Sequence, residues 1–131
     1  MKFNWYFTKE DFEKCKKENA GDYVGNIRTG NLCFDIIQVE DDATLWIDCY
    51  VGGVDSGYGY SMNDDNYPYD YISEVGAAIE LNEYKDLTYE QFVSKVEKEL
   101  TDSINNKVEY VADNKETVNL IDKANEPLKI W

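Results

Sequence analysis

The stretch that decides the fold is DYVGNIRTGNLCFDIIQVEDDATLWIDCYV, residues 22–51. It concentrates valine, isoleucine, phenylalanine, tyrosine and tryptophan, which favour β-strands. Gly30-Asn31 fits a two-residue hairpin turn, and residues 40–43 fit a four-residue turn. The stretch therefore predicts three antiparallel strands in a meander over about residues 22–51.

The two turns also predict a register. The first turn pairs residues 29, 27 and 25 with 32, 34 and 36, and the second pairs 39, 37, 35 and 34 with 44, 46, 48 and 49. One face of the sheet then carries a set of apolar side chains: Ile27, Leu32, Phe34, Ile36, Leu45, Ile47, Cys49 and Val51. The opposite face carries a mixed set: Asn26, Arg28, Asp35, Trp46, Asp48 and Tyr50. The apolar face is the expected core surface.

Two helix starts share one pattern, FTKEDF at residues 7–12 and LTYEQF at residues 87–92. In each, a threonine at the N-cap precedes an acidic or amide residue at N3, as in a capping box, and apolar residues flank the cap. The second start opens an amphipathic helix over about 89–105, with Phe92, Val96, Leu100 and Ile104 on one face. The first opens a short helix over about 9–18.

The remaining elements are less sharply marked. Tyr71–Leu81 and Lys107–Val111 are candidates for further strands of the same sheet. A third helix is expected to start at Asp113 or Asn114 and to carry Val118, Leu120 and Ile121, with Pro127 barring its continuation. Strands clustered between helices predict a single α+β domain over residues 1–131, with the 89–105 helix packed on one face of an antiparallel sheet.

Composition and cysteine usage bear on the compartment. The chain has 131 residues, enough to bury a core without a metal or a disulfide. Cys15, Cys33 and Cys49 form no CxxC pair, which favours buried thiols in a reducing compartment. No apolar stretch suits a signal peptide or a membrane helix. We expect a soluble cytoplasmic protein with no cofactor and no membrane contact.

Charge is the strongest functional signal. The net charge is −14, and residues 41–90 hold twelve acidic residues and a single base, Lys85. No basic residue lies between Arg28 and Lys85. This asymmetry disfavours direct binding to nucleic acid or to an anionic membrane, which requires a basic footprint. It favours a basic partner, a cation, or solubility alone.

Several chemistries are excluded or disfavoured. The chain has no histidine, so Ser-His-Asp and Cys-His catalytic systems and zinc sites built from histidine and cysteine are ruled out. The glycine-rich segment GGVDSGYG, residues 52–59, lacks the lysine of a phosphate loop and is surrounded by Asp55, Asp64 and Asp65. It is therefore a poor phosphate site.

Two acidic groups leave a cation-binding or small enzymatic domain open as an alternative. The predicted register sets Asp35 opposite Asp48, and two like charges there would raise a pKa or recruit a cation or a base. Arg28 would relieve that pair internally, and a different register or full solvation would remove it. The Asp64–Asp70 loop offers oxygen ligands for calcium, but its spacing departs from the EF-hand pattern.

The segment between the third and fourth predicted strands combines tyrosine, glycine, serine, asparagine and aspartate. This mixture is typical of protein-binding loops, because tyrosine supplies a large contact area with few rotatable bonds. Tyrosines on a strand that pack on the core are the alternative. The expected partner-binding residues are Asp41, Asp42, Asp55, Tyr58, Tyr60, Asp64, Asp65, Tyr67, Tyr69, Asp70 and Glu74.

In composition, though in no motif, the chain is similar to small acidic inhibitors from phages and mobile elements, including anti-CRISPR and anti-restriction proteins, and to immunity proteins of nuclease toxins. The likeness implies a non-enzymatic protein that occupies a basic surface of a nucleic-acid-binding enzyme, its carboxylates standing in for phosphates. Twelve carboxylates match about 20 Å of duplex at about one charge per 1.7 Å. An accessory module whose charge serves only solubility is a further alternative.

Overall fold

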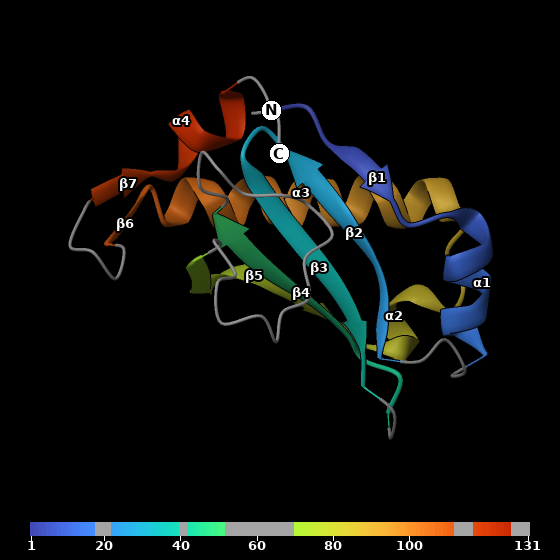
Figure 1. Cartoon of the computed structure of the whole chain (residues 1–131). Coiled ribbons are helices and arrows are strands. Elements are labelled where there is room, and N and C mark those ends of the chain that lie inside the picture. The colour runs from blue at the N-terminus through green and yellow to red at the C-terminus, as the bar shows by residue number, and fades with distance from the viewer. Residues whose placement is uncertain (18–21, 40–41, 52–69, 112–116, 127–131) are drawn as a thin grey trace.

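The computed structural model describes residues 1–17, 22–39, 42–51, 70–111 and 117–126. Its central element is a five-stranded antiparallel sheet (Figure 1). The strands follow one another in sequence order: β1 (Asn4–Tyr6), β2 (Tyr23–Thr29), β3 (Leu32–Gln38), β4 (Leu45–Val51) and β5 (Asp70–Ile79). The meander over 22–51 and the strand predicted over 71–81 are confirmed, and the edge strand β1 is an addition to the predicted sheet.

The register of the meander is the predicted one. Ile27 lies opposite Phe34 across β2 and β3, and Asp35 lies opposite Asp48 across β3 and β4. Gly30 at the first turn has a φ of 55°, in the left-handed region that favours glycine. A Cβ at this position would collide with carbonyl oxygens of residues 123 and 124, so the turn also needs glycine for close packing. Turn chemistry and alternation were sufficient to set this part of the fold.

Both predicted helix starts are present. Helix α1 (Lys9–Lys16) and helix α3 (Tyr89–Asn106) each begin after a threonine N-cap with a complete capping box. In α3 the Thr88 hydroxyl accepts from the Gln91 backbone N–H at 3.1 Å, and the Gln91 side chain accepts from the Thr88 N–H at 2.9 Å.

Among the described residues, no helix is long and apolar enough to cross a membrane.

The core lies between the sheet and α3, which runs across one sheet face (Figure 1). The predicted apolar face is buried along its whole length, as are the apolar positions of α3. Phe12 of α1 stacks on Phe92 with ring centroids 4.7 Å apart, and Trp5 of β1 meets the same ring at 6.1 Å. A short helix, α2 (Leu81–Tyr84), is not among the predicted elements; its Tyr84 hydroxyl donates to the Ala43 carbonyl at 2.6 Å. The result is an α+β fold with helices packed on an antiparallel sheet.

The strand candidate at 107–111 is corrected. Residues Glu109–Val111 form β6, which pairs with β7 (Thr117–Asn119) in a separate two-stranded sheet and does not extend the main sheet. The physical reason is proximity along the chain. A partner six residues away closes a short loop, and a short loop costs less entropy than a distant pairing.

The third predicted helix is also corrected. Helix α4 (Leu120–Asn125) begins later than expected, after Asn119, whose side chain accepts from the Asp122 N–H at 2.9 Å. Val118 belongs to β7, where it pairs with Tyr110. Asparagine is a strong N-cap, and the cross-strand pairing holds the residue before it extended. The proposed start at residues 113–114 lies outside the described residues.

Candidate functional site

The face of the main sheet opposite α3 is called the outer face here, and the predicted register decides which side chains it carries. One row across the strands runs through residues 4, 28, 33, 50 and 71, and the next runs through 6, 26, 35, 48 and 76. Strands β3, β4 and β5 contain no lysine or arginine, while Arg28 on β2 is basic. The charge of the outer face is therefore unevenly distributed: acidic residues lie toward β3–β5, and a basic residue lies toward β1.

Asp35 and Asp48 form the cross-strand acidic pair that the sequence predicts. Asp35 is only 6% exposed, and the Cys33 thiol donates a hydrogen bond to its carboxylate at 3.7 Å. Burial is the main cause that raises the pKa of Asp35, to about 6; nearby Asp48 adds to the rise, and the thiol bond and Arg28 oppose it. Burial also raises the pKa of Asp48. Ionisation of Asp35 and Asp48 is therefore less favourable in the folded chain than in water.

Arg28 lies one position along β2 from the acidic pair. Its guanidinium sits 4.7 Å from the ring centroid of Tyr6, and its Nε donates to the Asn26 side-chain oxygen at 3.2 Å. Its charge reaches Asp35, whose pKa it lowers. Arg28 therefore relieves the acidic pair in part, while its side chain packs against β1.

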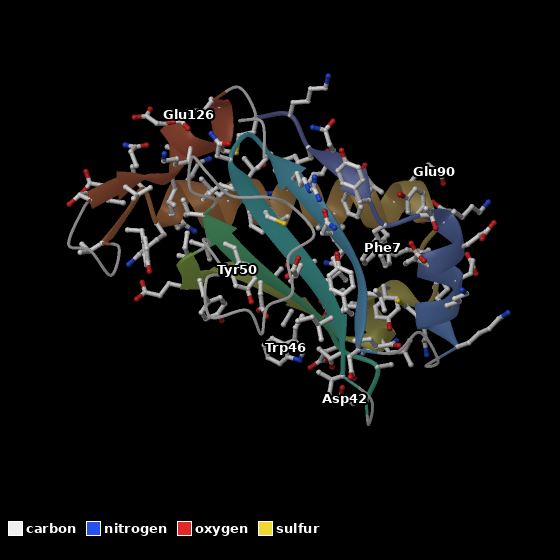
Figure 2. The ribbon with its side chains drawn as sticks, in the orientation of Figure 1. Phe7, Asp42, Trp46, Tyr50, Glu90 and Glu126 are labelled. Atoms are coloured by element: carbon white, nitrogen blue, oxygen red, sulfur yellow. The ribbon has the colours of Figure 1, made fainter. Side chains whose placement is uncertain are left out.

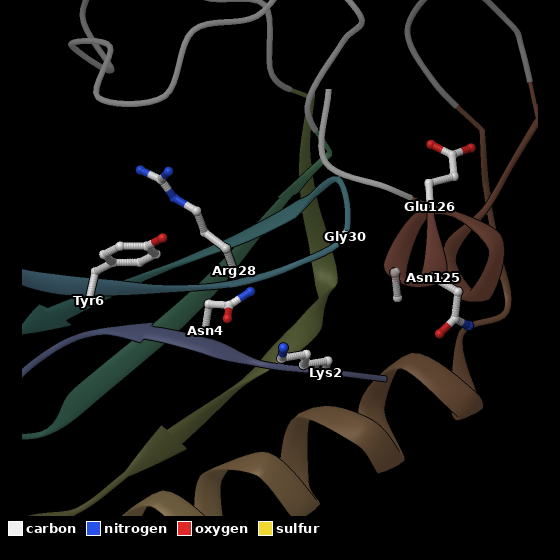
Figure 3. A pocket seen from close by; sticks show the side chains of 8 residues that line it. Lys2, Asn4, Tyr6, Arg28, Gly30, Asn125 and Glu126 are labelled. Atoms are coloured by element: carbon white, nitrogen blue, oxygen red, sulfur yellow. The ribbon is translucent and has the colours of Figure 1, made fainter. Parts of the chain in front are cut away.

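A hollow surrounds Arg28 at this end of the outer face. It has a volume of about 240 Å³ and lies between β1, the β2–β3 turn and the end of α4. Figure 3 shows Tyr6 and Arg28 projecting side by side, with Lys2 from the chain before β1 and Glu126 after α4. Glu126 lies 3.5 Å from the Lys123 ammonium and accepts from the Asn31 amide at 2.5 Å. Both signs of charge meet at this hollow.

A second hollow, of about 230 Å³, lies at the opposite end, over β4 and β5. We call it the Trp46 hollow; its lining includes Trp46, Asp48, Tyr71, Glu74, Gly76 and Ala78. Trp46 and Tyr71 are large aromatic side chains that remain 47% and 48% exposed. Figure 2 shows Trp46 and Tyr50 along β4, with Asp42 at the turn before it. Two exposed aromatic side chains and a carboxylate therefore share one concave surface.

A bulge in β5 shapes this hollow. Asp48 pairs with Gly76, but the next residue of β4, Cys49, pairs with Ile72, so β5 has three extra residues between the two pairs. Gly76 has a φ of 145°, and a Cβ there would collide with the Ile47 carbonyl oxygen. Its N–H turns away from the ladder and donates to the Ser103 hydroxyl of α3 at 3.1 Å. Glycine at residue 76 is therefore required by the close approach of the β5 and β4 backbones beside Asp48.

Tyr71, one of the two aromatic residues of the hollow, contacts a second aromatic ring. The rings of Tyr71 and Tyr50 contact each other with centroids 5.4 Å apart. Burial first, and then the charge of Asp48, raise the pKa of the Tyr71 hydroxyl. Tyr71 therefore contacts the Tyr50 ring and lies near the Asp48 carboxylate.

Three of the predicted partner-binding residues are described. Asp42 is exposed and accepts from the Thr44 N–H at 3.0 Å, and this backbone bond lowers its pKa. Glu74 is exposed and forms an ion pair with Lys107 at 2.7 Å. Asp70 begins β5, opposite Val51. The other predicted residues lie outside the described part: Asp41, Asp55, Tyr58, Tyr60, Asp64, Asp65, Tyr67 and Tyr69.

Among the residues in the described ranges, no group of three or more acidic or cysteine side chains is arranged to hold a metal ion. The Asp64–Asp70 loop lies outside those ranges except for its last residue. The residues that the structure adds to the candidate site are Trp46, Tyr71, Gly76 and Ala78. The signal that points to them is a glycine within a strand, which marks a bulge or a close approach.

No protein-family model, no curated protein and no solved structure matches the chain. The candidate site therefore rests on the physical chemistry of its own residues.

Proposed function

We propose that this chain is a non-enzymatic binding protein that occupies a basic surface of a nucleic-acid-handling protein. The observation that carries the proposal is the composition of the outer face over β3–β5. Exposed Trp46 and Tyr71 lie there beside Asp48, on three strands without a lysine or an arginine. Buried aromatic anchors supply most of the affinity of protein interfaces, while charge steers association.

The charge pattern supports a partner that normally binds nucleic acid. Twelve acids against one base over residues 41–90 give this part of the chain a phosphate-like charge density. A surface that binds DNA or RNA is rich in lysine and arginine, and it is complementary to such a segment. An inhibitor of the anti-CRISPR or anti-restriction type, of phage or mobile-element origin, is the form that this proposal takes.

The proposal is tested by titrating the chain into cleavage assays of a panel of purified basic enzymes: restriction endonucleases, RNA-guided nucleases and nuclease toxins. We expect inhibition of a panel member that weakens as salt rises and that duplex DNA relieves by competition. Inhibition independent of both, or no inhibition of any member, would count against the proposal.

Charge reversal tests which acids matter. The double variant Asp64→Lys with Asp65→Lys should weaken inhibition, and so should Tyr67→Ala with Tyr69→Ala. The matched control is Glu13→Lys with Asp102→Lys, two exposed acids outside the acidic segment that change the net charge by the same amount. If the control weakens inhibition as much as the first variant, general charge and not this segment is responsible.

A second candidate function is favoured by the Asp35–Asp48 pair. The pKa of Asp35, at about 6, lies near the range that general acid–base chemistry uses, and two facing carboxylates attract cations. Calorimetric titration with calcium, magnesium and manganese tests this candidate. Heat of binding that Asp48→Asn abolishes would support it, and no heat with any of the three ions would reject the cation-binding form.

A further inference from the structure

We infer that the Trp46 hollow is the anchor point of the interface and accepts an arginine side chain of the partner protein. This inference rests on the proposed function and names the group that the partner presents.

The size and shape of the hollow suit one side chain. Its volume of about 230 Å³ is below the ~300–1,000 Å³ of pockets that enclose drug-sized ligands. Two lining residues, Gly76 and Ala78, are small, and they lie opposite Asp48 and Trp46 in the register. A larger side chain in place of Ala78 would fill part of this space. The small side chain at residue 78 therefore leaves room for an inserted group.

The walls suit a flat cation. Trp46 and Tyr71 are both about half exposed, and tryptophan and tyrosine faces attract cations through the ring quadrupole. One wall, Tyr71, also contacts the ring of Tyr50. A guanidinium is planar, stacks on aromatic faces and is weakly hydrated, so it fits such walls better than a lysine ammonium does.

Charge complementarity selects the same occupant. The carboxylate of Asp48 lines the hollow, and Asp35 lies beside it on β3. Glu74, at the rim, is already paired with Lys107, so Asp48 is the acid that an incoming cation meets. A guanidinium bonded to this carboxylate would also offset the like charge of Asp35. Binding of an arginine would therefore reduce the repulsion between Asp35 and Asp48.

The test uses a short probe, the peptide acetyl-Gly-Arg-Gly-amide, and the same peptide with neutral citrulline in place of arginine. Binding to the ¹⁵N-labelled full chain is followed by NMR at the indole N–H of Trp46 and the backbone amides of residues 46–48 and 76–78. We expect a saturable shift with the arginine peptide. Binding of the citrulline peptide should be at least about tenfold weaker, since charge and cation–π attraction are lost.

Variants locate the binding. Trp46→Ala and Asp48→Asn should each abolish the saturable shift. Binding to Trp46→Ala is followed at the backbone amides, and binding to Asp48→Asn is followed at the Trp46 indole N–H. The controls are Tyr23→Ala, an exposed aromatic residue outside the hollow, and Asp102→Asn, an exposed acid on α3. Both controls should bind the peptide as the parent chain does. Urea midpoints no lower than that of the parent chain verify that Asp48→Asn and the two controls are folded, and a cooperative urea transition verifies this for Trp46→Ala.

Failure of this inference differs from failure of the proposed function. If a panel enzyme is inhibited in a salt-sensitive way but the arginine peptide gives no saturable shift, or shifts no more than the citrulline peptide, the arginine anchor is overturned and the proposed function stands. If the peptide binds and no panel enzyme is inhibited, the proposed function fails and the cation-accepting hollow remains.

Discussion

Replacing Asp35 with asparagine is expected to stabilise the fold at neutral pH. Asp35 is buried on the outer face of β3 and faces Asp48 across the strands. Ionisation of a buried carboxyl beside a like charge is unfavourable, and this is why its pKa is raised. Asparagine has nearly the same shape and keeps an oxygen that accepts from the Cys33 thiol, so the substitution removes the charge with little change in packing.

The magnitude follows from the pKa. In the folded chain the pKa of Asp35 is about 6, against an ordinary value of 3.8. Each pKa unit corresponds to about 1.4 kcal/mol, so ionised Asp35 costs the fold up to about 3 kcal/mol. Allowing for an imperfect amide replacement, we expect Asp35→Asn to raise the free energy of unfolding by about 1–3 kcal/mol above pH 7.

The pH dependence has a definite sign. Between pH 3.8 and about 6 the folded chain binds more protons at Asp35 than the unfolded chain does. The free energy of unfolding therefore falls as pH rises through this window. The favourable contribution of the protonated group is fully present below the unfolded pKa and is lost above the folded one. The difference between variant and parent should accordingly be near zero at pH 4 and should reach its full value by pH 7.

The assay is urea denaturation of both proteins at pH 4, 5, 6, 7 and 8 and constant ionic strength, followed by circular dichroism. The control is Asp102→Asn, which removes an exposed acid paired with Lys98 and should show no gain in stability that grows with pH. A variant no more stable than the parent at pH 8, or a gain equal at pH 4 and pH 8, would refute the reasoning.

Three further predictions concern the core and the helix cap. Thr88→Ala should lower the free energy of unfolding by about 1 kcal/mol in urea, because the capping box of α3 is lost; an unchanged urea midpoint would contradict the capping role. Leu100→Ala should cost about 2–5 kcal/mol in the same assay, because the side chain is fully buried under the sheet; a loss below about 1 kcal/mol would argue against that burial. The three cysteines should react slowly with a thiol reagent until urea unfolds the chain, because burial raises the pKa of each thiol, to about 12 for Cys15 and Cys33; rapid labelling of all three in the native protein would be inconsistent with their positions.

Local rules account for the elements that the sequence predicts well. The meander needs only two turns and an alternation of period two, and the pairing of Asp35 with Asp48 follows from counting residues between them. The start of α3 needs only Thr88, Gln91 and the apolar residues spaced along the helix. Each of these signals lies within a short window of the chain, where backbone geometry limits the choices.

The same local rules did not predict which strands pair when more than one partner was available. Residues 109–111 have strand character, but they pair with β7 and not with the main sheet. Val118 lies in the same two-stranded sheet and not in a helix. In the same way, β1, which precedes α1 in the sequence, pairs with the edge of β2. Strand propensity does not identify a partner, because the energy of a strand depends on what it packs against.

The sequence by itself determined the acidic, base-free centre of the chain, the meander with its register, and the starts of the two main helices. Only the tertiary structure decided how deeply Asp35 is buried and that Trp46, Asp48 and Tyr71 line one hollow beside the bulge in β5. The physical reason is range. Alternation and capping act within a few residues, whereas burial, a raised pKa and a concave surface depend on which distant side chains share one face.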